Sequence, residues 1–296
     1  MANFDDLLNN APVNPDGQAT QLSKEDYAEK KKTEREDVFT LSDTAALTAV
    51  ENGGNFNQYL DVQSKFDRYS AVNTLLIMAQ KPEATRLGDF DYWKNKSGFI
   101  KQGQTAIAIL EPHEYTKEDG TPGTGYNIKK VFDVSQVDAR KVKVTTPPSY
   151  NDRQLLSALI SKAPMKISGV DNLSNNVGAY TDPQTGDIFI RKGMEFADTF
   201  RSLAQELCYA SVEQDGKNTV DPKFTAYCSA YLICKKYGVD TKEFNFESAS
   251  NMFSGFEPQQ IKQELSVIRD AAAGIGERMA KQLDAVQKAA RNQEAR

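Results

Sequence analysis

The most constraining feature of this sequence is an amphipathic segment in its second half. Residues 199–212, TFRSLAQELCYASV, place Phe200, Leu203, Leu207 and Ala210 at intervals of three and four. This spacing predicts a helix that buries one apolar face in a core. The segment therefore has to lie against other elements.

Five residues of this helix, 205–209 (QELCY), have the frame of the zinc-protease motif His-Glu-x-x-His. In that motif two histidines one turn apart bind the metal and the glutamate between them is the general base. Here Gln205 and Tyr209 stand at the histidine positions, and Glu206 alone keeps the pattern. The chain has one histidine, His113, so it cannot build a zinc site that needs two, and we expect this histidine at the surface.

Composition is that of a globular protein with one large or two ordinary domains. The chain has 296 residues, 39% of them hydrophobic, and a net charge of −5, so nucleic-acid binding would require a local basic patch. No apolar run could span a membrane, and residues 1–23 are too polar for a signal peptide. The three cysteines, at positions 208, 228 and 234, form no CxxC pair, so we expect reduced core residues in a cytoplasmic protein.

Periodicity changes along the chain predict an α+β protein. A polar tail is expected over residues 1–25. Helical spacing follows in residues 24–36, 41–50 and 55–80, with Ser42 or Asp43 as the cap of the second of these helices. Strands are expected at 105–110 and 126–134, and Pro147-Pro148 marks a boundary. In the second half we expect strands at 165–168, 177–181 and 187–191, and helices at 152–162, 221–237, 247–253 and from Pro258 to the end.

Basic and aromatic residues alternate between positions 65 and 101. This segment contains seven cations against four anions, with Tyr69, Tyr92 and Trp93 among its aromatic residues. Single-stranded nucleic acid is bound by aromatic faces that stack on bases and by cations that follow the phosphates. Core positions for Tyr69 and Trp93 are the alternative. A second basic segment, residues 129–143, contains Lys129.

An ordered series of short motifs in the first half resembles ArdC-type antirestriction proteins of conjugative plasmids. The motifs are YSAVNTLL (69–76), QKPEAT (80–85), the region of Trp93, and KQGQTAIAILEP (101–112). The resemblance implies a single-stranded DNA-binding α+β domain over residues 26–148. We predict that its DNA-binding residues are Arg68, Tyr69, Asn73, Tyr92, Trp93, Lys94, Lys96 and Lys101.

The second half, residues 151–296, resembles the metallopeptidase domain of the same family, similar to zincins of the ImmA/IrrE type, a helical domain with a small β-sheet. The whole chain is most similar to LtrC-like proteins of Gram-positive conjugative elements. The resemblance implies that Tyr227 stands where the family has its third ligand, a glutamate. With Gln205, Tyr209 and Tyr227 at the ligand positions, we expect no metal, no cofactor and no enzymatic activity, and a hydrogen-bonded or solvent-exposed Glu206.

These inferences favour a cytoplasmic, single-stranded DNA-binding protein of a mobile element, with a role in antirestriction or conjugation. One alternative is a protein-interaction scaffold that docks a partner through the helix at 258–296. The other is a residual metallopeptidase in which Glu206 joins acidic residues from elsewhere in an atypical metal site.

Overall fold

The computed structural model describes residues 23–294 except 139, 141, 143–147 and 175–176. The helices are α2 (Lys24–Val50), α3 (Gly53–Lys65), α4 (Ala71–Gln80), α5 (Phe90–Asn95), α6 (Asp152–Ile160), α7 (Phe196–Gln214), α8 (Pro222–Tyr237), α9 (Ala249–Met252) and α10 (Pro258–Glu294). The strands are β1 (Leu87–Gly88), β2 (Phe99–Ile100), β3 (Ile107–Thr116), β4 (Pro122–Asp133), β5 (Val137–Asp138), β6 (Ile167–Val170), β7 (Ala179–Thr181) and β8 (Ile188–Arg191). The predicted α+β class is confirmed.

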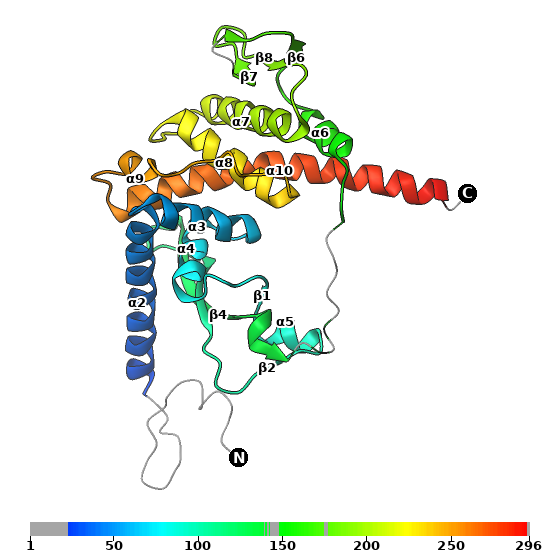
Figure 1. Cartoon of the computed structure of the whole chain (residues 1–296). Coiled ribbons are helices and arrows are strands. Elements are labelled where there is room, and N and C mark those ends of the chain that lie inside the picture. Colours follow the sequence, from blue (N-terminus) through cyan, green and yellow to red (C-terminus); the bar gives the residue numbers. More distant parts are fainter. Residues whose placement is uncertain (1–22, 139, 141, 143–147, 175–176, 295–296) are drawn as a thin grey trace.

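Two small sheets lie on opposite sides of a layer of helices (Figure 1). In the first half, β3 and β4 form a long antiparallel hairpin, and β1 extends it in the order β1-β4-β3. In the second half β8 pairs parallel with β6 and antiparallel with β7, above α7. A two-stranded pair, β2 with β5, lies beside α5.

Helix α10 is the element around which the other helices pack. It crosses the whole layer and contacts α2, α4, α6, α7 and α8 (Figure 1). Its buried positions recur from Ile261 to Leu283 at three- and four-residue steps. The predicted apolar seam of this helix therefore packs against the protein itself over these turns.

Hydrophobic packing continues across the predicted domain boundary at Pro147-Pro148. Phe56 of α3 stacks on Phe224, just inside α8, with ring centroids 5.7 Å apart. The Tyr231 hydroxyl of α8 donates to the Asp61 carboxylate of α3 at 2.7 Å. The division into two domains at residues 148–151 stays a prediction. Helices from both sides of this boundary contribute to one hydrophobic core.

Two helix boundaries differ from those predicted. The segments 24–36 and 41–50 form one helix, α2, which is capped by Ser23 and begins inside the predicted tail; residues 1–22 of that tail lie outside the described residues. Ser42 and Asp43 are not caps, because they lie inside α2. The Lys262 ammonium of α10 instead donates to both side chains, at 2.6 and 2.5 Å. Contact with α10 therefore replaces the predicted cap.

The predicted helix at 55–80 is two helices. It breaks between Lys65 and Ala71, where Ser70 caps α4 by accepting a hydrogen bond from the Asn73 N–H. A serine hydroxyl competes with helical backbone bonding in this way at helix starts.

The three cysteines are buried and unpaired, as predicted. Among the described residues, no helix combines the length and the apolar character that a membrane crossing requires.

Candidate functional site

A cleft of about 320 Å³ opens in the first half between the α3–α4 break, β1, α5 and the β3–β4 hairpin. Its volume lies at the lower end of the range for small-ligand pockets. Its lining residues are Tyr69, Asn73, Leu87, Gly88, Asp89, Tyr92, Ile109, Leu110, Glu111, Pro112, Lys129 and Val131. Three of the predicted DNA-binding residues, Tyr69, Asn73 and Tyr92, therefore meet at one site.

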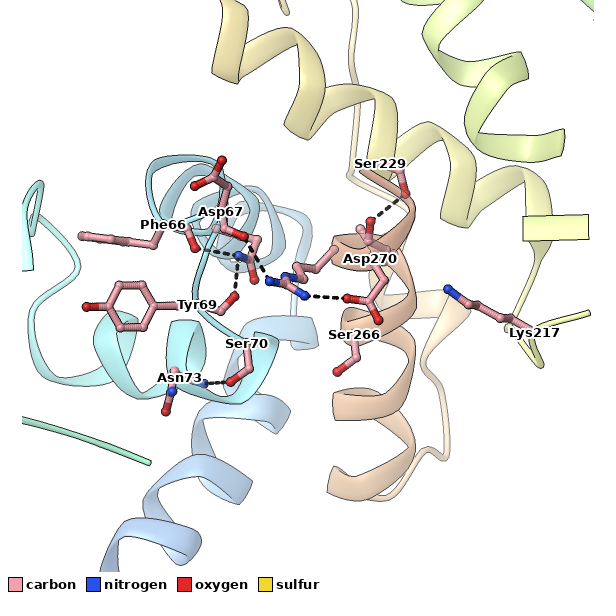
Figure 2. Close-up of polar contacts among 12 residues, drawn as sticks. Phe66, Asp67, Tyr69, Ser70, Asn73, Lys217, Ser229, Ser266 and Asp270 are labelled. Carbon is pink, nitrogen blue, oxygen red and sulfur yellow. Dashed lines mark hydrogen bonds and ion pairs between the residues drawn. The ribbon is translucent and has the colours of Figure 1, made fainter. Parts of the chain in front are cut away.

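The helix break that disrupts the predicted helix also positions Tyr69. The buried Gln63 amide donates to the carbonyl oxygens of Phe66 and Tyr69, at 3.1 and 3.4 Å (Figure 2). The Arg269 guanidinium of α10 donates to the Asp67 carbonyl at 3.3 Å, so α10 holds the same loop from outside. Tyr69 is half-buried, and burial raises the pKa of its phenol.

Tyr92 reaches the cleft from α5. Its ring lies directly on Gly88, where an added Cβ would come within 2.1 Å of the Tyr92 Cδ1 atom. The Asp89 carboxylate caps α5 by accepting from the Tyr92 N–H at 2.8 Å. Tyr92 remains 38% exposed, so part of its ring is open to a ligand.

One side of the cleft carries a short chain of charges. The Lys129 ammonium lies 2.8 Å from the Glu111 carboxylate and 3.2 Å from that of Asp89. Hydrogen bonds to Glu111 and Asp89 raise the pKa of Lys129. Lys129 is therefore held in place as a charged ammonium between two carboxylates. It can exchange one of these carboxylates for a polar group of a ligand.

Asn73 and Gln80 of α4 hydrogen-bond to the backbone of β3 along the edge that no other strand pairs with. Asn73 accepts from the Leu110 N–H and donates to the Leu110 carbonyl, at 2.8 and 2.9 Å. Gln80 makes the same pair of bonds with Ala108. These bonds cover a strand edge that would otherwise be unpaired. Both polar ends of the Asn73 amide are thus used in holding the hairpin on α4, and its role in DNA binding stays a prediction.

Trp93 is not available for stacking. Its side chain is completely buried, and its indole N–H donates to the Phe132 carbonyl at 2.9 Å. It packs with Phe132, Val137 and Val142 in a small separate core under α5 and β2. The core alternative considered for Trp93 is therefore correct, and the prediction that it contacts DNA is wrong.

The predicted cations lie on the surface. Arg68, Lys94, Lys96 and Lys101 are all exposed, and Arg68 directly precedes Tyr69. Lys94 and Lys96 end α5, the helix that carries Tyr92. The Lys101 ammonium donates to the Ser135 carbonyl at 2.9 Å.

Sequence patterns alone do not identify Asp89, Glu111 and Gly88 as site residues. Sequence patterns place Lys129 only within the second basic segment, residues 129–143. Two other lysines of that segment, Lys141 and Lys143, lie outside the described residues. The signal that could have placed Lys129 and Glu111 is the hairpin register, because alternation puts Ile109, Glu111 and Lys129 on one face of the paired strands.

In the second half, Glu206 is held by a neighbouring strand. The Thr181 hydroxyl of β7 donates to the Glu206 carboxylate at 2.6 Å. Glu206, Gln205 and Tyr209 are all partly exposed on α7. Burial raises the pKa of Tyr209, and Glu213 and Glu206 add to the effect. The expectation of a hydrogen-bonded or solvent-exposed Glu206 is met, with Thr181 as the donor.

Tyr227 makes its hydrogen bonds away from Glu206. Its hydroxyl accepts from the Asn245 N–H at 2.7 Å, and its ring packs 4.8 Å from that of Phe244.

The donor set around Glu206 does not fit a zinc-protease metal. A threonine hydroxyl bonds the Glu206 carboxylate, and an amide (Gln205) and a phenol (Tyr209) occupy the two ligand positions of the motif, whereas such metals take imidazole, thiolate and carboxylate donors. Within the described ranges, no group of three or more His, Cys, Asp or Glu side chains could hold a metal ion.

Comparisons with known proteins agree with the sequence resemblance. Residues 47–146 match the sequence model of the N-terminal domain of anti-restriction factor ArdC. The metal-free crystal structure of the antirestriction ArdC protein from the R388 plasmid is similar with a TM-score of 0.50 and 17% identity, over 72% of this chain and 86% of that one. Its Mn(II)-bound structure gives a TM-score of 0.51 and 14% identity, over 75% of this chain and 98% of that one. At these identities the similarity establishes the fold. No curated protein sequence matches this chain.

Proposed function

We propose that this protein binds single-stranded DNA at the cleft, because residues 47–146 match the ArdC N-terminal domain and the fold is similar to that of the R388 protein. The wider role is antirestriction for a plasmid or other mobile element during conjugation, in the cytoplasm. The antirestriction part of this proposal comes from the relatives alone. The binding part has support in the geometry of the cleft.

The observation that carries the proposal is that two tyrosines from separate elements line one cleft. Tyr69 comes from the α3–α4 break and Tyr92 from α5, and both line the cleft together with Lys129 of β4. Every base has a π face, so a tyrosine pair with one polar group binds single strands with little sequence preference. Paired bases in a duplex cannot enter such a cleft without unstacking.

Exposed cations that neighbour the cleft tyrosines in sequence are the proposed phosphate contacts. Arg68 adjoins Tyr69, and Lys94 and Lys96 follow Tyr92 by two and four residues. Lys129 is already paired with two carboxylates, so it serves the base end of a nucleotide rather than the phosphate. Affinity should therefore fall with salt, because phosphate contacts release counterions.

The experiment is fluorescence anisotropy with a labelled single-stranded oligonucleotide at two salt concentrations. Tyr92→Ala should weaken binding roughly 5- to 150-fold, because removing one base–aromatic stack costs about 1–3 kcal/mol. Tyr180→Ala is the matched control, because Tyr180 is a similarly exposed tyrosine on β7 in the second half. Lys94→Ala with Lys96→Ala should reduce the salt slope by about 0.7 for each phosphate that is no longer neutralised.

Binding that survives both Tyr92→Ala and the lysine double variant would refute the cleft as the binding site. Binding of duplex as strongly as of single strands would refute the stacking mechanism.

For the second half we propose a structural module without peptidase activity. Its support is the donor set around Glu206, which lacks imidazole and thiolate groups. The scaffold alternative requires an α10 surface that is free for a partner, but the buried positions of this helix pack on α2, α4, α6, α7 and α8 as far as Leu283. A truncation before Pro258 should therefore unfold the protein, whereas a docking helix could be removed cleanly.

A further inference from the structure

The β3–β4 hairpin extends well beyond the core that supports it. From Glu111 to Thr116 every residue of β3 is exposed, although the strands stay paired as far as Thr116 and Pro122. A two-stranded ribbon without a core is marginally stable in water. The base of the arm packs on α2, where the Phe39 and Tyr126 rings meet edge-on with centroids 6.1 Å apart. The end of the arm, from His113 to Thr116 of β3, therefore needs an explanation other than packing.

One face of this arm carries two aromatic rings placed over glycines. His113 pairs with Gly125, and Tyr115 pairs with Gly123, across the two strands. A Cβ added to Gly123 would lie 2.7 Å from the Tyr115 Cζ atom and 2.9 and 3.1 Å from the two Cε atoms. These distances place the glycine beneath the face of the ring rather than at its edge.

The His113 ring has the same arrangement. A Cβ added to Gly125 would come within 2.6 Å of both Cε1 and Nε2 of His113. Gly123 is buried on an otherwise exposed arm, so the Tyr115 ring covers it. Glycine weakens a strand interior and marks places of close approach. Here the glycines let both rings approach the neighbouring strand closely, and the two ring planes are tilted by 44° to each other.

This face is continuous with the cleft. Strand alternation places Ile109, Glu111, His113 and Tyr115 on one face of β3. Ile109 and Glu111 line the cleft, as do Leu110 and Pro112 from the other face, so the cleft meets the strand on both faces at this level. The one carboxylate that β3 contributes to this face is Glu111, which pairs with Lys129, an ammonium that it shares with Asp89; Glu114 projects from the opposite face. The centroids of the two rings are 6.4 Å apart, the spacing of alternate residues on a strand.

We propose that this hairpin face is a second stacking surface for single-stranded DNA, on which His113 and Tyr115 bind bases of the nucleotides that continue out of the cleft. The proposal rests on the DNA binding proposed above and extends it to a longer site. Short oligonucleotides occupy the cleft alone. Longer ones reach the arm and gain affinity from it.

The test compares labelled oligothymidylates of about four and about fifteen nucleotides, which bracket the site sizes of single-strand binding modules. The His113→Ala/Tyr115→Ala variant should bind the long oligonucleotide at least roughly 25-fold more weakly, since each of the two stacked bases contributes about fivefold or more. It should bind the short one as the wild type does. His113→Phe/Tyr115→Phe should keep the long-oligonucleotide affinity, because both rings remain.

Glu114→Ala/Thr124→Ala is the matched control, because these paired residues lie at the same level on the opposite face. It should leave both affinities unchanged. Both residues of the aromatic pair are exposed, so their removal should not unfold the chain, and a thermal melt checks this.

If the His113→Ala/Tyr115→Ala variant binds the long oligonucleotide as tightly as the wild type does, while Tyr92→Ala abolishes binding, the hairpin surface is refuted and the cleft remains the binding site. A wild-type dimer that the alanine variant converts to a monomer would also overturn it, by making this face an interface between two copies. If the wild type binds neither oligonucleotide, the proposed function fails together with the extension.

Discussion

Trp93→Phe separates a structural role of Trp93 from a role in DNA contact. Trp93 has no exposed surface, and its indole N–H bonds the Phe132 carbonyl. Phenylalanine keeps an aromatic ring in the small core but removes the donor, which leaves a buried carbonyl unsatisfied at a cost of about 1–3 kcal/mol. The smaller ring buries less apolar area, which costs about 1 kcal/mol more.

The variant should therefore lose about 2–4 kcal/mol of unfolding free energy, which corresponds to a fall in Tm of roughly 5–10 °C for a chain of this size. Urea unfolding and a thermal melt measure this loss. Affinity for single-stranded DNA should change less than about threefold at a temperature where the variant is folded, because a Trp without exposed surface cannot stack on a base.

A variant with wild-type stability and a tenfold loss of DNA affinity would refute this reasoning. Trp93→Ala is a poorer test. It should cost about 3–5 kcal/mol, and the local collapse would move Tyr92, whose ring meets that of Trp93 edge-on at 5.0 Å. DNA binding would then fall for an indirect reason.

Four further variants test three other parts of the structure. Asp43→Asn should destabilise the protein by about 2 kcal/mol in urea unfolding, because it leaves the buried Lys262 ammonium without its carboxylate, whereas Lys262→Met should be nearly neutral; equal losses would contradict this. Burial raises the pKa of Glu264, so this group favours the folded state below the unfolded pKa of about 4.3 and loses that contribution as pH rises through the folded value. Glu264→Gln should therefore gain stability relative to wild type as pH rises from 4 to 8, and an unchanged difference would contradict the assignment. Glu206→Gln and EDTA should leave DNA affinity and Tm unchanged. A Tm that falls when EDTA is added would support a metal site instead.

Local sequence patterns predict most elements of the fold. The hairpin turn at 182–186, with Gly186 at a φ of +73°, and the α8 helix between Asp221 and Gly238 follow from turn and cap chemistry alone. The sheet of the second half and the long final helix also lie where periodicity places them.

The errors come from tertiary contacts that no local pattern contains. Ser42 has the chemistry of a helix cap, but Lys262, 220 residues away, binds it in the middle of α2. The break before Ser70 depends on the Gln63 amide and on Arg269 of α10. Trp93 has the composition of a stacking residue, and only the position of the Phe132 carbonyl shows that it is core.

The cleft can be predicted only in part. Tyr69 and Tyr92 stand out as aromatic residues in a basic segment, but Glu111 and Lys129 enter through the register of a hairpin, which local patterns do not give. The register also brings His113, which the sequence places at the surface without a role, onto the face that continues the cleft.

The most direct test of the central claim is photo-crosslinking of a single-stranded oligonucleotide carrying 5-iodouracil, followed by mapping of the adducts by mass spectrometry. This chemistry favours aromatic side chains that stack on the modified base. Adducts are expected at Tyr92 or Tyr69, and none at Trp93. Adducts confined to α7 or α10, with none in residues 47–146, would contradict it.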